Sequence, residues 1–363
     1  MSILIISTGG LIYDGITNVI VSYLEAMNLK GMMVYVAGPL KIESEIREKI
    51  TNLGCKVVDL PNRKQHTFLY FIELIRFVRK NNIKVIHAHG NSATLAIEMM
   101  AGMFGGCKKR IAHSHNTKCE QVRADHLLRP IFYKAYTNAM ACGKDAGEWL
   151  FEKRPFKILR NGRNIERYRF NEKKRIKLRE EKNLLDNIVI GHVGGFVEQK
   201  NHKFILEIFR NIRKIKSNSK FFLVGDGNLR KEIECDAKSM GLYDDITFTG
   251  NIKNVEDILQ IMDGMVLPSF FEGVPLVTIE WQISGLPTII SDNVSDECIC
   301  TELVKKLSLN DSPKIWAERI ISMVENNDRK KSSIQAECLI KKKGFDIKTN
   351  ALELKKIYRQ EGM

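Results

Sequence analysis

A strand, a turn and a helix follow one another in the stretch from Met265 to Pro287, and the fold must accommodate this unit. The apolar run Met265–Leu267 predicts the end of a buried strand. Pro275 stands where we expect the first residue of a helix, because its missing N–H costs nothing there. The helix is expected to end at Ser284, since a glycine and a proline follow. A helix that starts just past a strand end directs free N–H groups to one place, where an anion such as a diphosphate can bind.

Two acidic residues lie near the start of that helix. Glu272 is in the turn, and Glu280 is on the second turn of the helix. Carboxylates beside an anion site can accept hydrogen bonds from the hydroxyl groups of whatever the diphosphate carries. Two acids at this spacing also occur by coincidence, so the flanking proline, serine and glycine positions decide the interpretation.

The whole pattern, Pro-Ser-x-x-Glu-Gly-x-Pro-Leu-x-x-x-Glu-x-x-x-x-Gly-Leu-Pro, resembles the retaining nucleotide-sugar glycosyltransferases of family 4, especially those of capsular and exopolysaccharide synthesis. The resemblance implies an α/β protein with a GT-B fold, in which two Rossmann-like parallel-sheet domains face each other across a cleft. It implies that Glu280 binds the ribose of the donor. It also implies that Glu272 is catalytic and holds sugar hydroxyls for front-side attack, with Gly273 and Val274 beside it at the donor.

The implied reaction moves a hexose or N-acetylhexosamine from a nucleoside diphosphate sugar, with a UDP-sugar favoured. The acceptor is expected to be a glycan or a polyprenyl-diphosphate-linked glycan in surface polysaccharide synthesis, and the transfer is expected to proceed with retention. No cofactor is expected besides this substrate. Because the sequence contains no Asp-x-Asp, we expect a metal-independent enzyme.

Length and composition fit two domains. The chain has 363 residues, and its hydrophobic content of 44% supports two cores. It has no apolar run of about 18 residues, and its first residues lack the basic and apolar regions of a signal peptide. The eight cysteines include no Cys-x-x-Cys pair, which favours a reduced protein. We expect a cytoplasmic protein, either free or peripheral on the inner face of the plasma membrane.

The formal charge of +14 calls for an anionic partner or a local explanation. Nucleic acid, an anionic membrane surface and an anionic small substrate all fit such a charge. Nucleic acid is not expected, because no basic motif interleaved with aromatic residues is present. The basic run between Lys153 and Lys182 fits a solvated helical surface near a linker as well as it fits a binding patch.

Short apolar runs alternate with helical patterns along the chain, which indicates β-α units and a parallel sheet in each half. The strands expected in the first half are Ile3–Ile6, Met33–Ala37, Lys56–Val58, Val85–Ala88, Arg110–His113, Ala139–Cys142 and Lys157–Leu159. Those expected in the second half are Ile188–Val193, Phe221–Val224, Ile246–Thr249 and Met265–Leu267. Helices are expected at Val19–Leu29, His66–Arg79 and Lys203–Lys214, the second of them buried on nearly every side.

A change in composition at the Asn161-Gly162 turn marks a domain crossing, since a proline, this turn and a charge run meet there. The resemblance implies an N-terminal, acceptor-binding domain at residues 1–162. It implies a nucleotide-sugar-binding domain at 163–345. The amphipathic helix in the segment 346–363 is expected to cross back to the first domain.

In open α/β sheets ligands bind beyond the carboxyl ends of the strands, so residues there are candidate contacts. After the first strand, a glycine loop feeds a helix near Gly15, which we expect to lie close to the diphosphate, although an ordinary β-α turn explains the same loop. In the second half Gly195, Gly225 and Gly250 follow three strands. Lys200, at a helix start, is expected to neutralise charge on the leaving diphosphate.

Gly195 departs from the family pattern, which usually has an arginine after the first glycine of this loop. The leaving-group site therefore has one cation fewer, and Lys200 acts alone unless Arg160 or Arg163 near the crossover replaces it. A non-catalytic or weakly active partner of another glycosyltransferase is thus an alternative, as is a GT-B-fold sugar-nucleotide epimerase. The presence of both glutamates argues against these alternatives.

Two expected strand ends carry His-x-His, and period-2 spacing places each pair on one face of its strand. His87, His89, His113 and His115 together suggest a metal site. Against it, metal sites usually include a carboxylate or thiolate, and two pairs on different strands need not lie at the same depth. We therefore expect no metal. By resemblance His115 is the catalytic histidine that faces the donor sugar, and His113 is a candidate for a packed core histidine.

Overall fold

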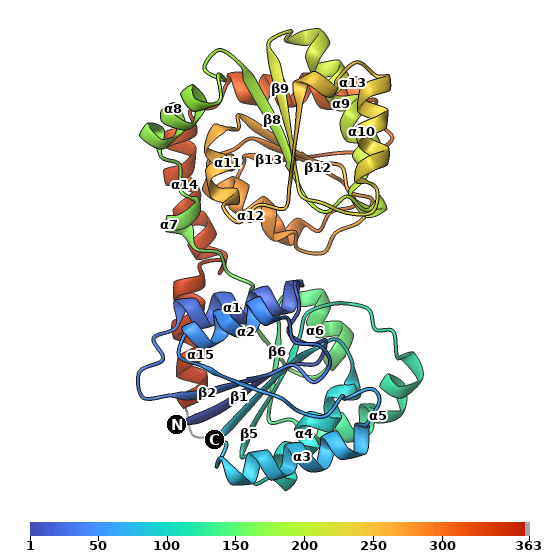
Figure 1. Ribbon diagram of the computed structural model, residues 1–363, viewed down its shortest axis with the longest axis vertical. Helices are drawn as coiled ribbons and strands as arrows, with labels where there is room; N and C mark the ends of the chain where they lie inside the picture. The colour runs from blue at the N-terminus through green and yellow to red at the C-terminus, as the bar shows by residue number, and fades with distance from the viewer. Residues whose placement is uncertain (360–363) are drawn as a thin grey trace. The chain divides into compact units, whose positions relative to one another are not determined.

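The computed structural model describes residues 1–359, which form two compact units. Unit 1 consists of residues 1–162 together with the segment from Ile347 onward, and unit 2 consists of Arg163–Asp346. Each unit is built around one parallel sheet (Figure 1). Within residues 1–359, no helix is both long and apolar enough to cross a bilayer.

The sheet of unit 1 has seven strands in the order β3-β2-β1-β4-β5-β6-β7, and all of its strand pairs are parallel. Its strands are β1 (Ser2–Ser7), β2 (Met33–Ala37), β3 (Lys56–Val58), β4 (Val85–Gly90), β5 (Lys109–Ser114), β6 (Asn138–Ala141) and β7 (Lys157–Ile158). The chain reverses direction across the sheet between β1 and β4. At such a switch point the carboxyl ends of the strands leave a crevice for a ligand.

Helices cover both faces of this sheet, because successive residues of each strand point to opposite sides. Ile3 and Ile5 of β1 join the apolar cluster with α1, α2 and α15, whereas Leu4 and Ile6 join the cluster with α3 to α6. The helices are α1 (Gly15–Ala26), α2 (Ser44–Asn52), α3 (Thr67–Lys80), α4 (Ala96–Phe104), α5 (Val122–Ala135), α6 (Lys144–Phe151) and α15 (Ile347–Arg359), with the 3₁₀ turn η1 (Ala93–Leu95).

The sheet of unit 2 has six parallel strands in the order β10-β9-β8-β11-β12-β13, which is the same arrangement with its switch point between β8 and β11. The strands are β8 (Ile188–Val193), β9 (Ser219–Val224), β10 (Ile246–Gly250), β11 (Gly264–Leu267), β12 (Thr288–Ser291) and β13 (Val304–Leu307). The α/β, Rossmann-like sheet predicted for each half is therefore confirmed.

One face of this second sheet packs against α9, α10 and α13, and the other against α7, α11, α12 and α14 (Figure 1). The helices are α7 (Ile165–Tyr168), α8 (Glu172–Glu181), α9 (His202–Ile215), α10 (Arg230–Ser239), α11 (Val255–Ile261), α12 (Leu276–Ile283), α13 (Pro313–Glu325) and α14 (Arg329–Lys342). Three 3₁₀ turns complete the unit, η2 (Glu198–Lys200), η3 (Tyr243–Asp245) and η4 (Asp296–Cys298).

The elements differ from the expectations in four details. The helix expected at Val19–Leu29 is α1, which spans Gly15–Ala26, and the strands β12 and β13 were not predicted. Helix α3 is not buried all round: Phe68 is 79% exposed, because only a stripe at helical spacing faces the sheet. Pro275 precedes α12 instead of opening it, and its carbonyl accepts the Thr278 N–H at 3.1 Å.

Candidate functional site

Glycines at the carboxyl ends of β8, β9 and β10 converge on one place in unit 2. The Gly194 N–H donates to the Val224 carbonyl oxygen at 2.9 Å, and the Gly225 N–H donates to the Gly250 carbonyl oxygen at 3.1 Å. A Cβ atom at Gly225 would lie 2.2 Å from the Gly194 carbonyl oxygen, so this close approach of two backbones requires glycine. The predicted donor contacts Gly225 and Gly250 are thus adjacent.

Lys200 and Glu272 form an ion pair beside these glycines. A Cβ atom at Gly194 would lie 3.3 Å from Lys200 Cε, which places the lysine against the glycine loop. The Phe270 N–H donates to the Gln199 carbonyl oxygen at 2.9 Å, so the loop before Glu272 is tied to η2. The two charged side chains are only 15% and 12% exposed. A cation and an anion are therefore held together at the carboxyl edge of the sheet.

Three further predicted residues frame this group. Gly195 has no left-handed φ, and an added Cβ would come no closer than 3.5 Å to any atom, in this case the Asp226 carbonyl oxygen. Gly273, next to Glu272, is exposed and has no atom within 4 Å of an added Cβ. Val274 is half-buried and packs against the core on the α12 side. Gly195 therefore leaves space for a side chain.

Glu280 occupies a different environment from Glu272. It lies on α12, is 7% exposed, and pairs with Arg163 through a contact of 2.8 Å between Oε1 and Nε. Burial raises the pKa of the Glu280 carboxyl above its ordinary value, and the charge of Arg163 opposes that rise. Glu280 is therefore a buried helix residue, whereas Glu272 lies in a loop. Arg163, which was a candidate partner of the diphosphate, is engaged by Glu280.

Two buried histidines near Lys200 were missed in the sequence. His192 Nδ1 lies 2.9 Å from the Val266 carbonyl oxygen, which can only accept, so Nδ1 carries the proton and Nε2 is an acceptor. His202 opens α9 and stacks on Phe196 with a centroid distance of 4.2 Å. Burial, reinforced by Lys200, lowers the pKa of His202 to about 4. The one sign of these residues in the sequence was a histidine inside the otherwise apolar strand β8.

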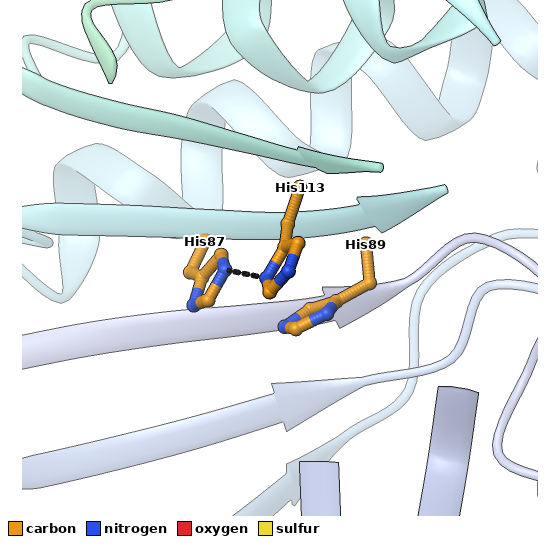
Figure 2. Close-up of side chains that lie close together, drawn as sticks. All are labelled: His87, His89 and His113. Carbon is orange, nitrogen blue, oxygen red and sulfur yellow. Dashed lines mark hydrogen bonds between the residues drawn. The ribbon is translucent and has the colours of Figure 1, made fainter. Parts of the chain in front are cut away.

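In unit 1, four histidines stand on the neighbouring strands β4 and β5 or just past them, and Figure 2 shows three of them, His87, His89 and His113. The strands are parallel, with His89 directly opposite His113, so the two pairs are staggered by two residues and only these two histidines lie at the same depth. His113 is fully buried, as expected for a core histidine. His115 is half-buried, and its Nε2 lies 2.8 Å from Nδ1 of His89. Burial lowers the pKa of His115 to about 3.

Gly15, the other predicted site residue of unit 1, is the first residue of α1. Asp14 caps this helix, and its Oδ1 accepts the Thr17 N–H at 2.7 Å. Asp14 lines a cavity of about 990 Å³ at the carboxyl edge of the sheet. Its polar lining includes Thr8, Asp14, Arg63, Lys64, Asn91, Ser92, Asn116 and Lys118. Unit 1 thus holds Gly15 and His115, and unit 2 holds the other predicted residues.

Arg63 is a cation of that cavity held by several hydrogen bonds, and it was not predicted. Its guanidinium contacts both carboxylate oxygens of Glu98, at 2.7 and 3.1 Å, and also donates to the Thr94 carbonyl oxygen at 2.8 Å. Glu98 is fully buried and accepts a further hydrogen bond from the Tyr70 hydroxyl at 2.9 Å. Because Arg63 and Glu98 lie on different elements, local sequence patterns give no sign of this pair.

Comparison with known proteins identifies the family. Residues 173–337 match the family model described as glycosyl transferases group 1. The chain is 31% identical over 326 residues to the putative glycosyltransferase EpsF of Bacillus subtilis, covering 86% of this chain and 84% of the relative. The chain belongs to the group 1 glycosyl transferases. The predicted family is therefore confirmed.

This glycosyltransferase also resembles CapH, a capsular polysaccharide biosynthesis glycosyltransferase of Staphylococcus aureus, with 24% identity over 86% of each chain. Among solved structures, HepE of Anabaena in complex with UDP superposes with a TM-score of 0.82 over 98% of this chain and 99% of that chain, at 14% identity. WaaG, a glycosyltransferase of lipopolysaccharide biosynthesis, superposes with a TM-score of 0.68. These likenesses agree with the predicted GT-B class of fold.

Proposed function

We propose that this glycosyltransferase moves a hexose or N-acetylhexosamine from a UDP-sugar to a glycan or lipid-linked glycan during surface polysaccharide synthesis, with retention. Three relatives support the proposal. One is the UDP-Gal:alpha-D-GlcNAc-diphosphoundecaprenol alpha-1,3-galactosyltransferase of Escherichia coli, 26% identical over 63% of this chain. The second is CapH, whose name refers to capsular polysaccharide biosynthesis, and the third is HepE, whose crystal structure is a complex with UDP.

The observation that carries the proposal is the Lys200–Glu272 ion pair at the glycine-lined edge of unit 2. When a donor binds, the diphosphate competes with Glu272 for the Lys200 ammonium, and released Glu272 becomes available to sugar hydroxyls. Lys200 then stabilises the negative charge that develops on the leaving diphosphate. Because Gly194, Gly225 and Gly250 carry no side chains, the phosphates can approach the backbone closely. Glu280 would bind the ribose from α12.

The cavity of unit 1 supports the acceptor half of the proposal. A cavity of about 990 Å³ is large enough for several sugar rings. Its lining combines hydroxyl and amide groups with three cations, Arg63, Lys64 and Lys118, and two carboxylates, Asp14 and Glu120, and such a polar lining suits a glycan. We propose that His115 contacts the donor sugar and that the backbone at Gly15 lies near the diphosphate. We also propose that unit 1 binds the acceptor.

The release of free nucleoside diphosphate from a panel of sugar nucleotides, with and without a polyprenyl-diphosphate-linked glycan, tests this function. We expect release from a UDP-sugar and stimulation by the acceptor. Lys200→Ala should lower release by about a hundredfold or more, as expected for a group that stabilises transition-state charge. Lys203→Ala is the matched control, because Lys203 follows Lys200 closely in the chain and forms an exposed ion pair with Glu232. Equal loss in both variants, or no release from any sugar nucleotide, contradicts the proposal.

A further inference from the structure

Arg63 of unit 1 is fixed on one side of its guanidinium and unpaired on the other. It precedes α3 in the chain, and only 12% of its side chain is exposed. Its Nε donates to Glu98 Oε1 at 2.7 Å, and its Nη2 donates to Glu98 Oε2 at 3.1 Å and to the Thr94 carbonyl oxygen at 2.8 Å. A guanidinium has five N–H donors, so the two N–H groups of Nη1 remain.

The unpaired nitrogen belongs to the lining of the large cavity in unit 1. Within residues 1–359 Nη1 of Arg63 makes no hydrogen bond, yet it is not a buried atom. Arg63 lines the cavity of about 990 Å³ at the carboxyl edge of the sheet, together with Thr94 and Thr67. The accessible side of its guanidinium is therefore the side that a ligand in this cavity would meet.

The partner of Arg63 holds the guanidinium in one position. Glu98 lies in the first turn of α4, is fully buried, and accepts a further hydrogen bond from the Tyr70 hydroxyl of α3 at 2.9 Å. The arginine is thus tied to two helices and to the η1 turn. A donor that is already ordered loses little conformational entropy when a ligand binds to it.

The same pairing decides which ligand groups Arg63 can bind. A carboxylate or phosphate binds an arginine most strongly through two parallel N–H bonds on different nitrogens. Both such forks of a guanidinium use an N–H of Nη2, and both N–H groups of Nη2 are engaged, by Glu98 and by Thr94. The two N–H bonds left on Nη1 diverge, so each of them suits a single oxygen such as a sugar hydroxyl.

The charges around the cavity favour the same class of ligand. Five charged side chains line it, three cations and two carboxylates: Arg63, Lys64, Lys118, Asp14 and Glu120. Glu98, behind Arg63, adds a third carboxylate. Because these formal charges balance, the cavity has no net attraction for an anion, whereas its hydroxyl, amide and guanidinium groups can bind hydroxyl oxygens.

We propose that Arg63 determines acceptor specificity: its Nη1 donates to a hydroxyl oxygen of an uncharged sugar in the acceptor, and a uronic acid at that place is disfavoured. This inference rests on the proposed function, in which unit 1 binds the acceptor. Arg63 is a binding residue in this role and takes no part in bond breaking. If the Arg63–Glu98 pair were only structural, its removal would change stability without changing the binding of sugars.

Binding of small glycosides tests the site without the reaction. Methyl galactoside and methyl galacturonide differ only in a hydroxymethyl group or a carboxylate on the ring, and methyl glucoside and methyl glucuronide form a second such pair. Saturation-transfer NMR on the full chain, with excess UDP present, measures their binding. We expect each neutral glycoside to bind about tenfold more tightly than its uronide. Tighter binding of a uronide, or no binding of either neutral glycoside, overturns the proposal.

The double variant Arg63→Met, Glu98→Gln removes the donor without leaving a buried carboxylate unpaired, and the new amide can still accept from Tyr70. It should weaken binding of the neutral glycosides by about tenfold or more, since a hydrogen bond from a charged donor is lost. Arg47→Met, Asp59→Asn is the matched control, because it removes an exposed arginine–carboxylate pair of unit 1. Unchanged binding in the first variant, or equal loss in both, overturns the proposal.

Glu98→Gln alone keeps the donor and removes the charge that balances it. The uronides should then bind more tightly than they bind to the wild type, and the neutral glycosides should still bind. Denaturant unfolding shows whether each variant is folded. An unchanged preference for the neutral glycosides in folded Glu98→Gln would overturn the specificity that we assign to the Arg63–Glu98 pair.

Kinetics separate this inference from the proposed function. With a polyprenyl-diphosphate-linked glycan that ends in an uncharged sugar, Arg63→Met, Glu98→Gln should raise KM for the acceptor about tenfold and leave KM for the donor unchanged. An unchanged KM for the acceptor overturns the role of Arg63 while the transferase function stands. If the wild type transfers no sugar but binds neutral glycosides in a way that depends on Arg63, the proposed function fails and the sugar site stands.

Discussion

Glu272 and Glu280 are the same residue type in one sequence motif, yet their surroundings give them different consequences on mutation. Glu272 lies in a loop and pairs with Lys200. Glu280 is buried on a helix against Arg163. Removal of Glu272 exposes a lysine to a site that a donor diphosphate would occupy, whereas removal of Glu280 leaves an arginine facing the core.

We predict that Glu272→Ala abolishes transfer at a modest cost in stability. The loss should exceed about a hundredfold, because the glutamate is proposed to orient the reacting sugar. Stability should fall by about 1–3 kcal/mol, because Lys200, whose side chain is only 15% exposed, loses its partner. Glu232→Ala, which breaks the exposed pair with Lys203, is the control for loss of an acidic partner. Turnover in Glu272→Ala above about a tenth of the wild-type rate would show that the donor assignment is wrong.

Glu280→Ala should lower both transfer and stability. The Arg163–Glu280 pair is largely buried, with 16% and 9% of the two side chains exposed, so removing its carboxylate should cost about 3 kcal/mol in the free energy of unfolding. The double variant Glu280→Ala, Arg163→Met removes the charge as well, so it should recover much of the stability and none of the transfer. Denaturant unfolding and the nucleotide-release assay measure the two effects separately. If the double variant regains activity, Glu280 acts through Arg163 and not through the ribose.

The sequence identified most of the residues in this motif but not their partners. The proline, glycine and acidic positions around Glu272 are contiguous, so a local pattern was sufficient to predict them. Arg163 contacts Glu280 from a distant part of the chain, and Arg63 contacts Glu98 from another element. Such contacts depend on how helices pack on the sheet, which local spacing does not encode.

At the scale of single elements, two strands of unit 2 were not predicted, the buried strand β12 and the edge strand β13, whereas the edge strand β10 was. Met33–Ala37 is a continuous apolar run and Ile188–Val193 is one interrupted by Gly191 and His192, and both were predicted with the observed bounds. Strand β13 at the sheet edge reads Val-Lys-Lys-Leu, which has the composition of an exposed segment. Its β structure follows from parallel pairing with β12, a tertiary contact that its own residues do not reveal.

The loop after β8, which contains Gly195, allows a test at the scale of a single element. We predict that Gly195→Arg raises turnover by about tenfold, because the added cation would sit in the glycine loop beside Lys200, where charge develops on the leaving diphosphate. The backbone there is not left-handed, and an added Cβ meets nothing closer than 3.5 Å, so the loop should tolerate the side chain.

Gly195→Gln is the control of similar size without charge and should not raise turnover. Steady-state kinetics with a UDP-sugar measure both variants. A drop in turnover for both would mean that the diphosphate needs close approach to the Gly195 backbone. An unchanged rate in Gly195→Arg would mean that another arginine already supplies the charge.

The histidines of β4 and β5 should make unit 1 sensitive to acid. Burial lowers the pKa of His115 from its ordinary value of 6.5 to about 3, so between these values the unfolded chain binds a proton that the folded unit does not. The free energy of unfolding should therefore fall as pH decreases through this window, by up to about 1.4 kcal/mol per pH unit for each such histidine. His115→Gln should make the dependence shallower, and His126→Gln, an exposed control, should not. The same slope in His115→Gln as in the wild type would contradict the burial of a neutral His115.

For the whole molecule, the basic charge is distributed unequally between the units. Unit 1 has 27 Lys and Arg against 15 Asp and Glu, a net charge of +12, whereas unit 2 has 30 against 28, a net charge of +2. Part of the basic run between Lys153 and Lys182 is engaged within unit 2, where Arg175 and Arg179 both pair with Asp263. The charge that needs an external partner therefore belongs to unit 1, the unit to which we assign acceptor binding.

We predict that unit 1 carries the protein to anionic membranes, where a lipid-linked acceptor would be found. Its helices α3 and α5 expose large apolar side chains, among them Phe68 at 79% and Leu127 at 76%, and the same helices carry exposed basic residues. Apolar insertion combined with basic attraction favours an anionic lipid surface, and the electrostatic part weakens with salt. Phe68→Ser with Leu127→Ser should reduce co-sedimentation with anionic vesicles by about tenfold, whereas Ile334→Ser, at a comparably exposed apolar position of unit 2, should not. Binding that is indifferent to salt and to the anionic lipid content, or equal loss in the unit 2 variant, would contradict this assignment and would leave the soluble glycan as the acceptor to test first.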